Sequence, residues 1–150
     1  MSSVDWLHTA ANLGAFLSAL AAAVAIVVAI RTYKRQTNAQ IFLEFTKRYD
    51  DTMASFQTAA RNARLNLAGK PPEESEEVSL AVLRYLNLCS EEFYLFRRGY
   101  LATDIWGLWE AELKRTLGSP LFIREWKRLR SEFQSYPEFR EYVDSTHAER

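Results

Sequence analysis

The pattern of apolar and charged positions divides the chain near residue 31. No Asp, Glu, Lys or Arg occurs between residues 6 and 30, and a basic segment follows at once. An α-helix rises about 1.5 Å per residue, so about 20 apolar residues cross a hydrocarbon layer about 30 Å thick. The pattern therefore predicts a transmembrane anchor with a basic flank over residues 1–35 and a water-facing helical domain over residues 36–150.

The charges that flank this apolar stretch predict its orientation. Arg31, Lys34 and Arg35 follow the apolar stretch. The titratable side chains of residues 1–10 are only those of Asp5 and His8. Basic residues beside a single span stay on the cytoplasmic side, where they also lie among anionic lipid head groups. We expect a single-pass membrane protein with its N-terminus outside and its C-terminal domain in the cytoplasm.

Two alternatives to the anchor are less favoured. A cleaved signal peptide carries its basic residues before the apolar run, and here they come after it. A buried soluble helix of this kind would need a larger core than so short a chain can build.

The helical domain begins with an apolar stripe over residues 36–67, on which Phe42, Tyr49 and Phe56 are spaced seven residues apart. No Gly or Pro occurs between residues 15 and 68, so the anchor is expected to continue as one long helix until Gly69, Pro71 and Pro72 break it.

Further helices are expected over the rest of the chain. Residues 78–98 form the most apolar segment and the expected central helix, which ends at Gly99. Folded back on the preceding helix, it is expected to bring Cys89 level with Phe56. Ser119 and Pro120 mark another helix start. The predicted fold is all-α: one N-terminal transmembrane helix that continues into a long cytoplasmic helix, packed with three or four others as a small bundle.

Composition restricts the chemistry. The 19 basic and 19 acidic side chains give no net charge, so no overall field attracts nucleic acid, and none is expected as a partner. Cys89 is the only cysteine, and His8 and His147 lie near opposite ends of the chain. We therefore expect no disulfide, no metal site, no cofactor and no catalytic residues.

Three carboxylates are the residues on which an enzyme could depend: Glu91, Glu92 and Asp104. Glu91 and Glu92 point about 100° apart on a helix, so only one can face a given site. A salt bridge or a solvated edge is the favoured interpretation. An inward Glu91 would need a cationic partner, because an unpaired buried charge costs several kcal/mol.

Trp106, Trp109 and Trp126 are the candidates for contact with a partner. Tryptophans at helical spacing usually bury apolar surface in a core or an interface. This interpretation is favoured over a cofactor-binding site.

Small residues recur within the predicted anchor and could form a packing face. Such residues let membrane helices approach closely, and we expect this face to pack on a span of another copy or of a larger complex. They form two rows at four-residue spacing: Gly14, Ser18 and Ala22, and Ala11, Ala15, Ala19 and Ala23.

The chain also resembles a known family. The resemblance lies in Asn-Ala-Gln-Ile-Phe-Leu-Glu-Phe from Asn38, Tyr-Leu-Asn-Leu-Cys-Ser-Glu-Glu-Phe from Tyr85, Arg-Gly-Tyr from Arg98, and the stretch 109–126. These segments resemble a bacterial family of small, uncharacterised single-span membrane proteins with a helical cytoplasmic domain. The resemblance implies this architecture and a place in the bacterial inner (cytoplasmic) membrane, and it brings no activity and no site residues.

Three functions follow from these features, in order of preference. The first is a non-enzymatic, membrane-anchored interaction module, an accessory or assembly subunit of a larger bacterial membrane complex that contacts the lipid bilayer and other transmembrane helices. The second is an oligomerising membrane effector of stress or phage defence, for which a polar pore lining would have only Asn12 and Ser18. The third is an enzyme that uses Glu91, Glu92 or Asp104.

Overall fold

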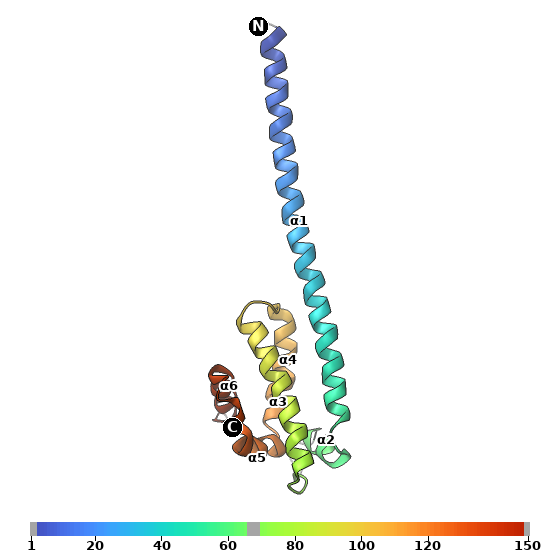
Figure 1. Cartoon of the computed structure of the whole chain (residues 1–150), viewed down its shortest axis with the longest axis vertical. Coiled ribbons are helices and arrows are strands. Elements are labelled where there is room, and N and C mark those ends of the chain that lie inside the picture. Colours follow the sequence, from blue (N-terminus) through green and yellow to red (C-terminus); the bar gives the residue numbers. More distant parts are fainter. Residues whose placement is uncertain (1–2, 66–69, 149–150) are drawn as a thin grey trace. The chain divides into compact units, whose positions relative to one another are not determined.

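The computed structural model describes the backbone of residues 3–65 and 70–148, and the side chains of residues 8, 12–63 and 70–148. All regular elements within these ranges are helical, as predicted (Figure 1). The elements are α1 (Ser3–Ala54), α2 (Thr58–Leu65), α3 (Glu76–Arg97), α4 (Thr103–Leu117), α5 (Pro120–Leu129), the 3-10 helix η1 (Arg130–Phe133) and α6 (Pro137–Ala148).

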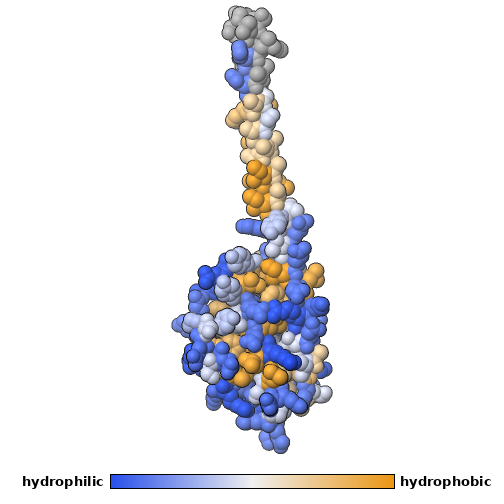
Figure 2. Space-filling view, viewed as in Figure 1, coloured by the Kyte–Doolittle hydropathy of each residue, from blue (hydrophilic) through white to orange (hydrophobic). Residues whose placement is uncertain are grey.

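The chain forms two compact units, residues 1–40 and residues 41–150, and α1 contributes to both. The first unit is the expected long apolar helix. Its large apolar side chains are exposed, for example Phe16 at 66% and Ile26 at 60%. Figure 2 shows them as a pale to orange band that ends at hydrophilic residues. Among the described helices, α1 is the one long and apolar enough to be a candidate membrane span.

The expected helix over residues 36–67 ends early, so the described residues contain five further α-helices rather than the predicted three or four. α1 stops at Ala54, and the short helix α2 starts at Thr58. The Ser55 hydroxyl donates to the Thr52 carbonyl at 2.6 Å, and the Phe56 amide donates to the Met53 carbonyl at 3.2 Å. Such bonds offer the backbone an alternative to the helical ladder. The turn buries Phe56, which is 2% exposed, against the second unit's core. The predicted break at Gly69 lies outside the described residues.

Helix α3 is central in the second unit, as expected. It packs on α4, α5 and α6, and Val82 and Leu86 are fully buried. The side chain of Ser75 accepts a hydrogen bond from the Val78 amide and caps the helix start. Gly99 ends the helix with φ at +72°, a left-handed conformation that glycine adopts without strain.

The remaining helices complete the core around aromatic side chains. Ser119 caps α5 and Pro120 takes its first position, as the sequence predicts. The rings of Trp126, Phe133 and Phe139 are in mutual contact, with centroids between 5.5 and 6.3 Å apart. This unit therefore has a closed core of its own.

The predicted register between the first helix and α3 is wrong. Arg48 on α1 pairs with Glu91 on α3, and Gln57 bonds with Glu77 just after α3 begins. Cys89 consequently lies beside Thr46 and Tyr49 rather than at the level of Phe56.

Candidate functional site

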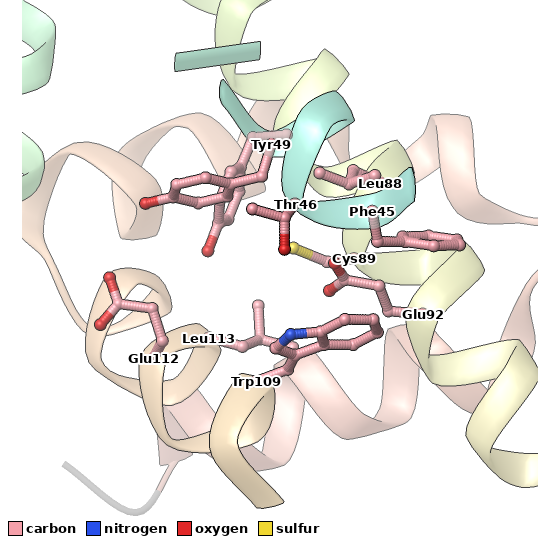
Figure 3. A pocket seen from close by; sticks show the side chains of 10 residues that line it. Phe45, Thr46, Tyr49, Leu88, Cys89, Glu92, Trp109, Glu112 and Leu113 are labelled. Carbon is pink, nitrogen blue, oxygen red and sulfur yellow. The ribbon is translucent and has the colours of Figure 1, made fainter. Parts of the chain in front are cut away.

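A cavity of about 250 Å³ lies within the second unit, between the last turns of α1, the middle of α3 and the middle of α4 (Figure 3). We call it the aromatic cavity. Each helix lines it with residues three or four positions apart, which share one helix face. The lining residues are Phe45, Thr46 and Tyr49 from α1, Tyr85, Leu88, Cys89 and Glu92 from α3, and Trp109, Glu112 and Leu113 from α4.

Aromatic rings form much of the cavity wall. Trp109 contacts two rings of α1, with its centroid 5.5 Å from that of Phe45 and 5.9 Å from that of Phe42. Tyr49 meets Tyr85 edge to face at 6.4 Å. These pairs hold the three helices together and keep the cavity largely apolar.

Glu92 is the buried carboxyl of this site. The residue is 8% exposed, and Figure 3 shows its carboxyl directed into the cavity. Desolvation raises the pKa of Glu92 to about 8; the charge of Arg48 opposes this rise, and the charge of Glu91 adds to it. At neutral pH the carboxyl is therefore mostly protonated.

Glu91, its neighbour, has a different environment. Its two carboxylate oxygens accept hydrogen bonds from Arg48 at 2.5 and 3.0 Å, in a bidentate pair whose side chains are 39% and 46% exposed. The predicted salt bridge thus forms at Glu91, and Glu92 is the residue that faces inward. The sequence identifies both Glu91 and Glu92 as candidates, but it does not give the register of α1 against α3 that decides which of them faces inward.

Of the three candidate carboxylates, Glu91, Glu92 and Asp104, only Glu92 lines the aromatic cavity. Asp104 is exposed, and its Oδ1 accepts a hydrogen bond from the Ile105 amide at 3.0 Å. It does not line the aromatic cavity. Within residues 3–65 and 70–148, no group of three or more His, Cys, Asp or Glu side chains could hold a metal ion.

The three tryptophans occupy separate environments. Trp106 is 4% exposed and stacks on Phe96 with centroids 4.8 Å apart. Trp126 is 3% exposed, and its Nε1 donates to Asp144 at 2.9 Å. Of the three, only Trp109 lines the aromatic cavity.

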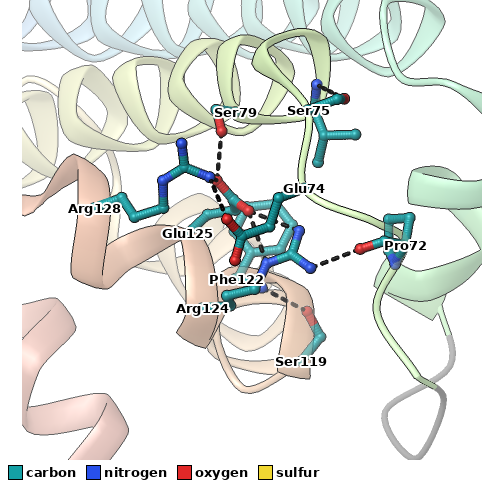
Figure 4. Close-up of polar contacts among 10 residues, drawn as sticks. Pro72, Glu74, Ser75, Ser79, Ser119, Phe122, Arg124, Glu125 and Arg128 are labelled. Atoms are coloured by element: carbon teal, nitrogen blue, oxygen red, sulfur yellow. Dashed lines mark hydrogen bonds and ion pairs between the residues drawn. The ribbon is translucent and has the colours of Figure 1, made fainter.

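A second buried carboxylate, Glu125, joins α5 to α3 and to the segment before α3 (Figure 4). It is fully buried, accepts a hydrogen bond from the Ser79 hydroxyl at 2.7 Å and pairs with Arg124 at 2.7 Å. Arg124 also donates to the Pro72 carbonyl at 2.6 Å. This network is structural. The sequence gives no signal for this role of Glu125, because the hydrogen bond from Ser79 joins residues 46 positions apart in the chain.

A basic face on α5 and the start of η1 is formed by Arg124, Lys127, Arg128 and Arg130, and most of these side chains make such contacts. Arg128 pairs with Glu74 at 3.2 Å, and Arg130 pairs with Asp144 at 2.5 Å. Lys127 is exposed. The positive charges of this face therefore serve mainly to hold the helices of the second unit together.

The residues predicted for the anchor lie along α1. Those with described side chains are all exposed: Gly14, Ala15, Ser18, Ala19, Ala22, Ala23, Arg31, Lys34 and Arg35. A Cβ added at Gly14 would meet no atom within 4 Å. The side chain of Ala11 lies outside the described residues.

Comparisons of the chain with family models, with curated proteins and with solved structures find no match. The family resemblance therefore stays a prediction.

Proposed function

We propose that the protein is a non-enzymatic, membrane-anchored helical module that serves as an accessory or assembly subunit of a larger bacterial membrane complex. Residues 12–30 of α1 would cross the membrane, and residues 41–150 would form the cytoplasmic domain. The observation that carries this proposal is the contrast between the exposed apolar side chains of the first unit and the closed core of the second.

This contrast has a direct physical reason. Leu13, Leu17 and Val28 are each more than half exposed along α1. Apolar area in water costs about 25 cal/mol per Å², so a helix with this surface is stable only when lipid or other helices cover it. About 19 residues at about 1.5 Å each span about 28 Å, close to the thickness of the hydrocarbon layer.

Membrane fractionation tests the anchor. We expect the double substitution Val24→Lys with Val27→Lys to release the chain from alkali-washed membranes, because two charges at the centre of a span are costly. Leu108→Lys is the matched control: Leu108 lies in the second unit and is 68% exposed, so this chain should stay in the membrane. Recovery of the unchanged chain in the soluble fraction without detergent would refute the anchor.

Cysteine labelling tests the orientation. Cys89 is buried, so the wild-type chain gives a low background. An impermeant maleimide should label Ser3→Cys in intact spheroplasts and Glu132→Cys only after permeabilisation. The opposite pattern would place the helical domain outside the cell.

Pull-down from solubilised membranes tests the subunit role. We expect stoichiometric recovery of one larger assembly, and loss of it with Gly14→Leu or Ser18→Leu, because bulky side chains would keep helix backbones apart. Leu20→Ile is a control that leaves the small-residue rows unchanged. Recovery of the chain alone from native membranes would contradict the proposal.

A further inference from the structure

The aromatic cavity combines an apolar wall with an acid that has no partner. Within the described ranges, Glu92 makes no hydrogen bond or ion pair. Burying an unpaired polar group costs several kcal/mol, and an apolar residue at this position would avoid that cost. A buried acid that opens into a cavity is complementary to a ligand that supplies the missing partner.

Two arginines bonded to carboxylates beside the cavity do not supply this partner. Arg48 is held by the two oxygens of Glu91, and Arg115 donates to Glu112 on α4 at 2.9 Å. Both guanidinium groups are thus paired with other carboxylates. The Glu92 carboxyl is left for a cation that comes from outside the chain.

The rings around the cavity favour the same kind of ligand. The face of an aromatic ring carries partial negative charge and attracts a cation within about 6 Å of its centroid. Figure 3 shows the ring of Trp109 and the carboxyl of Glu92 facing one open space, with Tyr49 on the opposite wall. Trp gives the strongest interaction of this type.

We propose that the aromatic cavity binds a small organic ammonium ion, with the ammonium group at Glu92 and Trp109 and an apolar or aromatic body between the rings. At about 250 Å³ the cavity is somewhat smaller than the ~300–1,000 Å³ sites of drug-sized ligands, which favours a compact ligand. This site lies in the second unit and does not depend on the proposed membrane complex.

Binding would be linked to a proton. A cation beside Glu92 favours the ionised carboxylate, so the ligand would displace the proton that the carboxyl carries at neutral pH. With a pKa of about 8, about 1% of Glu92 is ionised at pH 6 and about half at pH 8. The affinity should therefore rise up to about 50-fold between these pH values.

Other groups near Glu92 can also titrate or carry charge. They are Arg48, Tyr49, Tyr85, Cys89, Glu91, Glu112 and, paired with Glu112, Arg115. Glu92→Gln removes the titration of Glu92 and leaves all these groups in place, so it separates their contributions from that of Glu92.

Fluorine NMR of a ligand tests the proposal on the full chain in detergent. The probe is 4-fluorobenzylammonium, the neutral control ligand is 4-fluorobenzyl alcohol, and empty micelles give the background. We expect saturable binding of the ammonium ion at least about tenfold tighter than that of the alcohol at pH 8, with the pH dependence above.

Variants locate the site. Glu92→Gln should remove the preference for the ammonium ion, and it keeps the shape of the neutral acid, so the domain should fold. Trp109→Phe keeps a ring and should weaken ammonium binding more than alcohol binding. Glu132→Gln, an exposed carboxylate outside the cavity, should bind like wild type. Equal affinity for the two ligands, no saturable binding, or a preference that survives in Glu92→Gln would each overturn the proposal.

Discussion

Replacing Glu92 with Gln should stabilise the second unit, and the gain should grow with pH. Glu92 is 8% exposed, and burial raises its pKa from 4.5 to about 8. A carboxyl with a raised pKa binds its proton more tightly in the folded state than in the unfolded state. The contribution of Glu92 to the free energy of unfolding is therefore highest below pH 4.5 and falls as the pH rises towards about 8.

The size of this effect follows from the two pKa values. A tenfold difference in proton affinity corresponds to about 1.4 kcal/mol, so the full loss between pH 4.5 and about 8 is about 5 kcal/mol. At pH 7 the wild type has lost about 3 kcal/mol of it. Because Gln carries no charge at any pH, the stability advantage of Glu92→Gln should increase by about 2 kcal/mol between pH 6 and pH 8.

Urea denaturation in detergent measures this difference. Trp106, Trp109 and Trp126 all lie in the second unit, so their fluorescence reports its unfolding. Subtracting wild type from variant at each pH removes the titration of all other groups, and Glu132→Gln controls for loss of an exposed carboxylate. A stability difference that is constant or that shrinks from pH 6 to pH 8 would show that burial does not raise the pKa of Glu92.

Three further substitutions test the packing of the second unit by the same assay. Phe122→Ala should lower the free energy of unfolding by about 3–5 kcal/mol, because Phe122 is fully buried and leaves a cavity; a loss below about 1 kcal/mol would contradict this role. Ser79→Ala should cost about 1–3 kcal/mol, since it removes a donor to the buried Glu125, and it should leave ligand binding unchanged. Asp144→Asn should cost little at pH 7 and nothing at low pH, because the hydrogen bond from Arg130 lowers the pKa of Asp144, so the stability it provides is lost as the pH falls below 3.8. An Asp144→Asn deficit that persists in acid would contradict that explanation.

The elements that the sequence predicts correctly have local signals. The central helix α3 ends at Gly99 because a left-handed residue is needed there, and α5 starts at Ser119 and Pro120 because capping and a fixed φ act within one turn. These signals depend only on neighbours in the sequence, so the sequence is enough to find them.

The end of α1 has no such signal. Residues 55–57 contain neither Gly nor Pro, and the helical pattern continues through them. The turn forms where Phe56 enters the core and meets Phe122, with ring centroids 6.4 Å apart. That contact joins residues 66 positions apart in the chain, so local propensity could not predict it.

The same limit applies to the choice between Glu91 and Glu92. Helix geometry predicts that only one of them faces a given site. Which one does so depends on the register of α1 against α3, fixed by the Arg48–Glu91 pair and by the contact of Tyr49 with Tyr85. The sequence does not predict the cavity either, because its walls come from three helices that are separate in the sequence and whose register it does not give.

The anchor and the cavity can be tested separately because they depend on different residues. The exposed apolar band lies within residues 12–30, whereas the buried apolar residues of the described chain lie between Phe45 and Val143. The core that shapes the cavity is thus complete without the apolar band. The double substitution Val24→Lys with Val27→Lys should release the chain from the membrane and leave ammonium binding unchanged. If binding were lost as well, the core of residues 41–150 would need the inserted anchor to form, contrary to its independent packing.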